Sequence, residues 1–413
     1  MRDYPVQISS GRRATSWFIA FLLAGGVLFS AASAAATPYV QTNLVTDDAA
    51  FLASQGYAPA TRVDPNLINP WGMSYTPNGS PIWVSDNGTG LSTLYPVTSA
   101  GVGVNATAVV IPPPAGGSPP SLPTGQVNTG QALATDFIVP NGAGTIKAGF
   151  IFATEGGTIA GRSAGNVSVT MVDHSASGAV YKGLAIGNSS AGWVLYAANF
   201  ASGQIEVFNS LWQPIALSGN FAGNAPPAPP LGCIGCVYAP FNVQTLNGEL
   251  YVTYALKDPA HPGDDISGAG NGYVEVFSLN GTFVRRIATN GVLNSPWGLD
   301  IAPAGFGEFA NALLVGNFGD GTINVFDPNS SAYLGTLSDG NSVIHIDGLW
   351  GLINGNGGNS GVPGSVYFTA GIGEEEHGLF GSLVATPEPA TLTLLGAGLL
   401  GLGAMRRRRK EKA

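Results

Sequence analysis

The chain of 413 residues contains 60 Gly and 29 Pro, and only 10% of its residues are charged. This composition has no collagen period, and with 45% hydrophobic residues it favours many short strands joined by tight turns over helices or disorder. Residues 37–385 carry 22 acidic and 7 basic side chains, a net charge of −15, which argues against nucleic acid as a partner because no cationic surface is available to replace phosphate counterions.

The first 36 residues are typical of a secretory signal peptide. Arg12 and Arg13 precede an apolar run at 17–29, and small residues follow up to Ala36. Such a pattern predicts export and cleavage near Ala34 or Ala36. We therefore expect the main domain to occupy residues 37–385.

The middle of the chain repeats one unit six times, at a spacing of about 55 residues. The clearest copies begin with NPWGMSYTP (69–77) and NSPWGLDIAP (294–303), and the six units are expected to start near residues 69, 130, 180, 240, 293 and 346. In the second unit, ATDFIV (134–139) is assigned as the opening strand and 111–125 as an insertion. Alternation in VEVFS, INVFD and IEVFN is the period of strands with one buried face.

These repeats predict an all-β fold, a six-bladed β-propeller. An isolated four-stranded unit cannot bury both of its faces, whereas six units stacked around an axis do so and leave only protected edges. Residues 39–45 are predicted to supply a strand that closes the ring with the last blade. Trp71, Trp297 and Trp350 recur at one repeat position, which favours packing between blades over a ligand cage.

The repeat is similar to NHL-type blades. More closely, the segments NPWG, YAPFNVQ, LYVTYA, NSPWGL, LLVGNFGDGTINVF, DGLWGL and FTAGI together resemble an uncharacterised family of secreted bacterial propellers, some of which carry PEP-CTERM tails. The resemblance covers residues 39–385. It implies the fold and an extracellular address, but no activity and no mapped site.

Polar loop residues are predicted to gather at one mouth of the central channel. In a four-stranded blade, the loop between strands two and three and the connection from the preceding blade open on the same face. Loops held by a rigid scaffold often carry function. The candidate ligand-binding residues on this face are Asn69, Asp86, Asn199, Asp264, Asn294, Asn317 and Asp347, and the same loops also carry Asn87, Glu155, Asp265, Asp320 and Glu374–Glu376.

The sequence defines no metal site. Cys233 and Cys236 lie in a Pro-rich loop, where a small local disulfide or unpaired thiols are expected, since zinc would need two more ligands and the four histidines do not cluster nearby. The run Glu374–His377 differs from the helical HExxH motif and is interpreted as a solvated loop. No cofactor is required by these motifs, and calcium is compatible with the oxygen-rich loops.

The C-terminal segment 386–413 has three parts in a fixed order. Pro387, Glu388 and Pro389 come first, followed by 16 uncharged residues at 390–405 and by RRRRK at 406–410. Sixteen helical residues span about 24 Å, which is short of a bilayer core of about 30 Å, but flanking arginines can snorkel to the interface. We predict a transmembrane segment at 390–405 with the basic tail in the cytoplasm.

This order resembles the PEP-CTERM sorting signal of Gram-negative bacteria, over residues 387–410. The resemblance implies export across the inner membrane, transient anchoring by the C-terminal helix and processing by an exosortase, a membrane-embedded transpeptidase. It also implies an association with exopolysaccharide and biofilm, at the cell surface or outside the cell. Pro387, Glu388 and Pro389 would be the recognition element and not catalytic residues.

Three functions are compatible with these features. The favoured one is a non-catalytic protein that binds a saccharide, a peptide or another surface protein. The second is a calcium-dependent hydrolase or lyase like the lactonases built on six-bladed propellers, which would also need a positioned base or a metal-bound water. The third is purely structural, because Asp and Asn before Gly form good turns and acidity maintains solubility.

Overall fold

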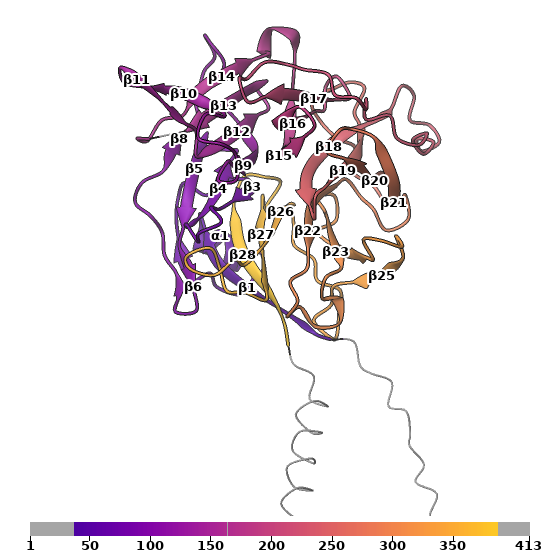
Figure 1. Cartoon of the computed structure of the whole chain (residues 1–413). Coiled ribbons are helices and arrows are strands. Elements are labelled where there is room, and N and C mark those ends of the chain that lie inside the picture. The colour runs from indigo at the N-terminus through magenta and orange to yellow at the C-terminus, as the bar shows by residue number, and fades with distance from the viewer. Residues whose placement is uncertain (1–36, 163, 387–413) are drawn as a thin grey trace, which may run out of the picture. The chain divides into compact units, whose positions relative to one another are not determined.

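The computed structural model describes residues 37–162 and 164–386, and these form an all-β propeller of six blades. Figure 1 looks onto the ring of blades, which follow one another around a central axis in chain order. The predicted six-bladed fold is therefore confirmed. The predicted signal peptide (1–36) and transmembrane segment (390–405) lie outside the described residues. Within the described part of the chain, no helix has the length and apolar character needed to cross a bilayer.

The first strand of each blade lies at the channel. Each of these inner strands contacts the inner strands of both neighbouring blades, so that they form a closed ring. They are β3 (Pro70–Ser74), β9 (Pro123–Asn128), β15 (Tyr181–Ser189), β18 (Val237–Leu246), β22 (Pro296–Ile301) and β26 (Leu349–Asn354).

The other strands follow outward as antiparallel ladders. The first two blades add β4 (Ile82–Asp86), β5 (Leu91–Tyr95) and β8 (Val109–Val110), then β12 (Phe150–Thr154), β13 (Thr158–Arg162) and β14 (Val169–Asp173). The third blade has only β16 (Gly192–Asn199) and β17 (Gln204–Asn209) outside β15. The last three add β19 (Glu249–Lys257), β20 (Gly272–Ser278), β21 (Phe283–Thr289), β23 (Leu313–Asn317), β24 (Ile323–Phe326), β25 (Tyr333–Thr336), β27 (Ser365–Ala370) and β28 (Leu379–Ala385).

The two ends of the domain close the ring together. Strand β1 (Tyr39–Thr46) pairs antiparallel with β28, in a register that runs from Tyr39 opposite Ala385 to Thr46 opposite Leu379. The backbone N–H of Thr386 continues the contact by donating to Pro38 O at 2.8 Å. The predicted closing strand is thereby confirmed. The short strand β2 (Arg62–Val63) adds to β1 in parallel.

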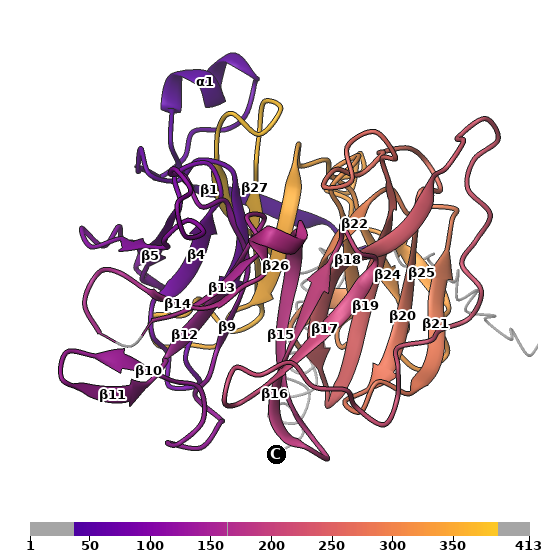
Figure 2. The ribbon, with the colours of Figure 1, turned by 90° about the horizontal axis from the view of Figure 1, so that it is seen from above.

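Few elements stand outside the blades. Helix α1 (Ala49–Ser54) follows β1 and is capped by Asp48, whose side chain accepts from the N–H groups of Ala50 and Phe51. Figure 2, turned by 90°, shows α1 projecting from one end of the propeller. The remaining strands form two hairpins, β6 (Val97–Thr98) with β7 (Gly101–Val102) and β10 (Ile138–Asn141) with β11 (Gly144–Lys147), and there are 3-10 turns at Ser175–Ser177 and Gly307–Phe309.

The second blade differs from the sequence-based assignment. Its inner strand is β9 at 123–128, which begins inside the segment assigned as an insertion and ends before the expected start near 130. Most of ATDFIV (134–139) precedes the β10–β11 hairpin, and its last two residues begin that hairpin. The reason is that PTGQVN carries no run of apolar side chains, although the structure buries most of it between neighbouring inner strands.

Hydrophobic cores lie between adjacent blades. Between the first two blades, for example, the ring of Trp83 stacks on Phe150 with centroids 3.9 Å apart. Similar buried clusters fill each of the other five blade interfaces. Each blade therefore buries both of its faces against its neighbours in the ring.

Glycines on the inner strands allow the blades to approach closely at the axis. A β-carbon at Gly72 would lie 2.6 Å from Thr124 O of the next inner strand, and one at Gly351 would lie 2.6 Å from Trp71 O. Gly125, Gly183 and Gly298 make equivalent approaches. In the fourth blade Asn242 takes this place and donates its Nδ2 to Trp297 O at 2.7 Å. The glycine after each repeat tryptophan is thus a packing requirement of the ring.

Candidate functional site

An aromatic cluster closes the central channel part way along its length. We call it the aromatic plug, and it consists of Trp71, Phe200, Phe241, Trp297, Phe318 and Trp350. The rings of Trp71 and Trp350 stack with centroids 3.4 Å apart, and Trp297 meets both edge-on at 5.8 Å. The three tryptophans are 2%, 4% and 1% exposed, so they pack against one another and do not form an open cage, as predicted.

The plug separates two mouths of the channel. We call the mouth at the start of the inner strands the upper mouth and the one at their ends the lower mouth. Asn69 joins the plug to the upper mouth, because its Oδ1 accepts from the indole N–H of Trp71 at 3.1 Å and of Trp350 at 3.0 Å. Its backbone has a positive φ of 46°, which Asn tolerates better than most residues.

A ring of polar side chains from all six blades surrounds the upper mouth. This polar ring consists of Asn69, Asn87, Glu155, Lys182, Asp265, Ser295 and Glu375. Asn69 Nδ2 donates to Glu375 Oε2 at 2.6 Å, and Asn87 Nδ2 donates to Glu155 Oε2 at 2.9 Å. Lys182 Nζ donates to the other oxygen of Glu155, and Ser295 Oγ donates to Asp265 Oδ2. The convergence of polar loops at this mouth is therefore a feature of the fold.

Lys182 is the cation of this ring. Its side chain is 5% exposed, pairs with Glu155 and lies over the face of Trp71, 4.9 Å from the ring centroid. Burial raises the pKa of Glu375 to about 7, and the nearby charges of Glu155 and Asp265 act in the same direction. Burial also raises the pKa of Asp265. Among the described residues, no three His, Cys, Asp or Glu side chains are grouped to hold a metal ion.

The predicted channel residues separate into different environments. Asn69 belongs to the polar ring, and Asn294 and Asn317 both donate to Asp320, at 3.2 Å each. Asp347 accepts from Gly373 N at 2.8 Å, and Asp264 is exposed in its loop. Asp86 is fully buried within its own blade, where it accepts from Thr93 N at 2.9 Å, because the last residue of β4 turns back onto β5.

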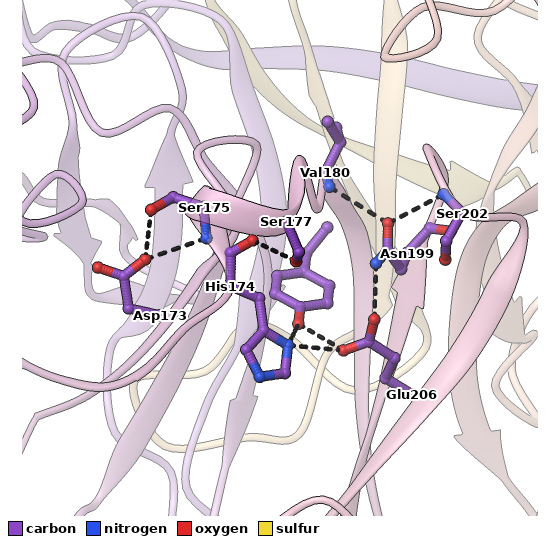
Figure 3. A network of polar contacts seen from close by, with 9 residues as sticks. Asp173, His174, Ser175, Ser177, Val180, Asn199, Ser202 and Glu206 are labelled. Carbon is purple, nitrogen blue, oxygen red and sulfur yellow. Dashed lines mark hydrogen bonds and ion pairs between the residues drawn. The ribbon is translucent and has the colours of Figure 1, made fainter.

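Asn199 serves a separate network between the second and third blades (Figure 3). Its Nδ2 donates to Glu206 Oε1 at 2.7 Å, while Tyr181 OH donates to Glu206 Oε2 at 2.6 Å. His174 Nδ1 lies 3.1 Å from the same carboxylate oxygen. Burial, followed by the hydrogen bond to Glu206, raises the pKa of Tyr181. These hydrogen bonds join the second and third blades, so the network serves the blade interface.

The structure also shows the contacts of the two cysteines and of the run Glu374–His377. Cys233 and Cys236 form a disulfide. In the run Glu374–His377, only Glu375 turns into the polar ring, while His377 Nδ1 pairs with Asp47 Oδ2 at 2.8 Å and stacks on Phe51. The imidazole is therefore engaged in packing α1 against the last blade.

A cavity of the described propeller lies on the other side of the plug. This lower cavity has a volume of about 680 Å3, within the usual range for small-molecule sites. Many of its wall residues lie on the inner strands, at or just after the glycine where neighbouring strands approach closely. Trp297 belongs to both the plug and the wall. The wall carries many amide and hydroxyl groups with apolar side chains between them, and among its described residues Asp300 is the sole carboxylate and no Lys, Arg or His occurs.

Four wall residues have a buried polar atom without a hydrogen-bond partner among the described residues. They are Ser74, Gln126, Trp297 and Asp300, which are 4–7% exposed. Buried polar atoms are almost always paired, so unpaired ones in a cavity wall need an explanation. Asp300 Oδ1 accepts from Ile301 N at 2.8 Å, while Oδ2 has no partner at hydrogen-bond geometry, although the backbone N–H of Asn354 lies close enough to lower the pKa of the carboxyl.

Burial raises the pKa of Asp300 to about 8. The folded chain therefore holds a proton on Asp300 between about pH 4 and 8, where the unfolded chain loses it. The folded state gains stability from this proton below pH 4, and this gain is lost as pH rises toward 8.

We expect Asp300→Asn to become progressively more stable than the wild type as pH rises from about 4 to about 8. The difference in unfolding free energy should grow by about 1.4 kcal/mol per pH unit and level off above pH 8. Urea unfolding of both chains across pH 4–9 measures it. A difference that is independent of pH would contradict the raised pKa.

The lower cavity was missed by sequence reasoning, which looked for sites on loops. One signal was available. The tryptophan-containing repeats align Ser74 with Asp300 and with Ile353, and packing does not explain a carboxylate at an inner-strand position that elsewhere holds Ser or Ile. Lys182 was also missed, because the start of the third unit near residue 180 was interpreted only as part of a blade.

Comparisons with known proteins agree with the fold and the tail. Residues 385–409 match the family model of the PEP-CTERM protein-sorting motif, which implies a secreted protein that is sorted by exosortase-type machinery. Two proteins of Acanthamoeba polyphaga mimivirus, both named as uncharacterized proteins, are 34% identical over 344 residues. These residues cover 81% of this chain and 79% and 84% of the relatives.

Solved structures show more distant likenesses. A glucose dehydrogenase is 13% identical, with 78% of this chain and 98% of that chain covered at a TM-score of 0.45. A gluconolactonase of Xanthomonas campestris is 14% identical, with 57% of this chain and 82% of that chain covered at a TM-score of 0.34. At these TM-scores the likenesses carry no argument about activity.

Proposed function

This chain belongs to the same family as the two mimivirus proteins, whose names give no activity. From the site of the chain itself, we propose that it is an exported binding protein for a neutral saccharide. The ligand enters the lower cavity. The binding is non-catalytic.

The composition of the cavity wall is the observation that carries this proposal. Amide and hydroxyl groups such as those of Gln126, Asn188 and Asn242 suit the many hydroxyls of a sugar, and Tyr75 and Trp297 supply apolar faces. Asp300 is the sole carboxylate of the wall, and its raised pKa keeps it neutral at pH 7. A charged ligand would find no counter-ion among these described groups.

The same wall argues against sugar cleavage. Most glycoside hydrolases place two carboxyl groups on either side of the bond that they break. In the lower cavity, Asp300 stands without a second carboxylate among the described wall residues. Binding without hydrolysis is therefore the function that this geometry supports best.

The proposed location of the protein suggests the source of the ligand. The PEP-CTERM match supports export, and we place the protein at or beyond the surface of a Gram-negative bacterium. The predicted segment 390–405 would hold it in the inner membrane until an exosortase acts at Pro387–Pro389. An exopolysaccharide of the same surface is then the nearest source of neutral sugar.

We expect the full chain to bind neutral polysaccharides and not polyanionic ones. Titration calorimetry in a detergent without a sugar headgroup measures this. Asn188→Trp, which places a large ring at the lower mouth, should weaken binding about tenfold or more, because the exposed Asn188 lines the entrance.

Asn329→Trp is the matched control, since Asn329 is exposed on an outer turn of the fifth blade away from the cavity. It should leave affinity unchanged. Binding of polyanions or peptides in place of neutral sugars, or equal affinity of Asn188→Trp and wild type, would refute the proposal.

A further inference from the structure

We infer that the lower cavity is a blind pocket that takes the terminal unit of a saccharide chain, held by Ser74, Gln126 and Asp300. This inference rests on the proposed function and adds which part of the ligand is recognised. An internal stretch of polymer would need an open groove or a through-channel.

The aromatic plug makes the pocket blind. Trp71, Trp297 and Trp350 are stacked across the axis and almost fully buried, so a chain that enters from the lower mouth ends against Trp297. Beyond them, the network from Asn69 to Lys182 occupies the upper mouth. A ligand can therefore enter only with one end first.

The orientation of Gln126 leaves an acceptor free. Its Nε2 donates to Gly72 O at 2.8 Å and to Trp83 O at 2.5 Å, which uses both donors of the amide and fixes it between the first two blades. Oε1 then has no partner among the described residues. A ligand hydroxyl is the group that an amide oxygen accepts from.

Asp300 and Ser74 complement this acceptor from two other inner strands. They occupy the same repeat position on β22 and β3, on either side of the last blade, and both have an unpaired oxygen. Neighbouring atoms cover these two oxygens in this structure, and a change of the terminal torsion of each side chain would bring the oxygen to a hydroxyl in the cavity. Together with the indole N–H of Trp297, which is also unpaired, they offer donors and acceptors to a unit rich in hydroxyls.

Chain-length analysis of a bound polysaccharide tests the inference. A neutral polysaccharide that binds the full chain is cut by limited acid hydrolysis into fractions of known mean length, and calorimetry counts the binding sites per milligram. If termini are recognised, the number of sites rises in proportion to the number of chain ends. A number of sites that stays constant per milligram would overturn the inference while leaving saccharide binding intact.

Two variants test whether the saccharide is recognised in the lower cavity. Asp300→Leu keeps the branched shape of the side chain, removes its polar atoms and relieves a buried unpaired carboxyl, so the chain should fold, and it should bind a short fraction about tenfold or more weakly. Glu375→Gln, in the polar ring at the opposite mouth, should bind as the wild type does. Unchanged affinity of Asp300→Leu would overturn the inference, whereas no binding of any neutral polysaccharide by the wild type would overturn the proposed function itself.

Discussion

Lys182→Met is expected to destabilise the propeller by about 3–5 kcal/mol, a large part of the total stability of a typical domain. Lys182 Nζ pairs with Glu155, and their side chains are only 5% and 20% exposed. Removal of the ammonium leaves the carboxylate of Glu155 with its Asn87 hydrogen bond but without a charge partner, in a ring that already contains Asp265 and Glu375. Urea unfolding of the full chain at pH 7 measures the loss.

A double variant separates charge from shape. Glu155→Gln with Lys182→Met replaces the pair by neutral groups of similar size, and it should recover most of the lost stability, because a buried pair contributes little beyond what its broken form costs. If the double variant is as unstable as Lys182→Met alone, the loss comes from packing on Trp71 and not from the unpaired charge.

Calcium binding at the upper mouth can be tested by its effect on thermal stability. Since Lys182 supplies the positive charge at the upper mouth, millimolar calcium should leave the Tm of the wild type unchanged. An increase in Tm for the wild type would favour a divalent ion at this mouth and would reopen the metal-dependent alternative.

The fold was predictable where strand patterns repeat with apolar side chains. NPWG and NSPWG mark β3 and β22 because the tryptophan packs at the axis and the following glycine lets the next inner strand approach. The same logic failed for β9. Its segment PTGQVN is buried between the neighbouring inner strands, where Thr124 and Gln126 donate hydrogen bonds to backbone carbonyls of adjacent blades. Because these buried side chains are polar, the segment lacks the apolar pattern by which a core strand is recognised.

The site was only partly predictable, because the upper mouth is formed largely by loop residues, whereas the lower cavity is lined by side chains of the inner strands. Loop topology placed Asn69 at the upper mouth, where the structure brings it together with Asn87, Glu155 and Glu375. It gave no means of knowing that Asp86 turns back into its blade. The lower cavity depends on the strand residues Ser74, Gln126 and Asp300, and their common orientation follows from the radius of the ring, which no local pattern encodes.

Gly125→Ala is expected to cost about 3 kcal/mol in unfolding free energy, at the upper end of the range for an overpacked core position. A β-carbon at Gly125 would overlap Leu184 N and lie 2.8 Å from Gly183 C, and these are backbone atoms of the next inner strand that cannot rotate away. Relief would require the second and third blades to separate at the axis, where all six inner strands are joined in one ring.

Gly144→Ala provides the matched control, because the β-carbon would meet no described atom closer than 3.9 Å in the β10–β11 hairpin. Neither glycine has the left-handed φ that would strain alanine, so the two variants differ only in what surrounds the added methyl group. Thermal and urea unfolding should show a large loss for Gly125→Ala and almost none for Gly144→Ala. Equal stabilities would mean that the ring tolerates a wider axis, and the inner glycines would then have no role in closing it.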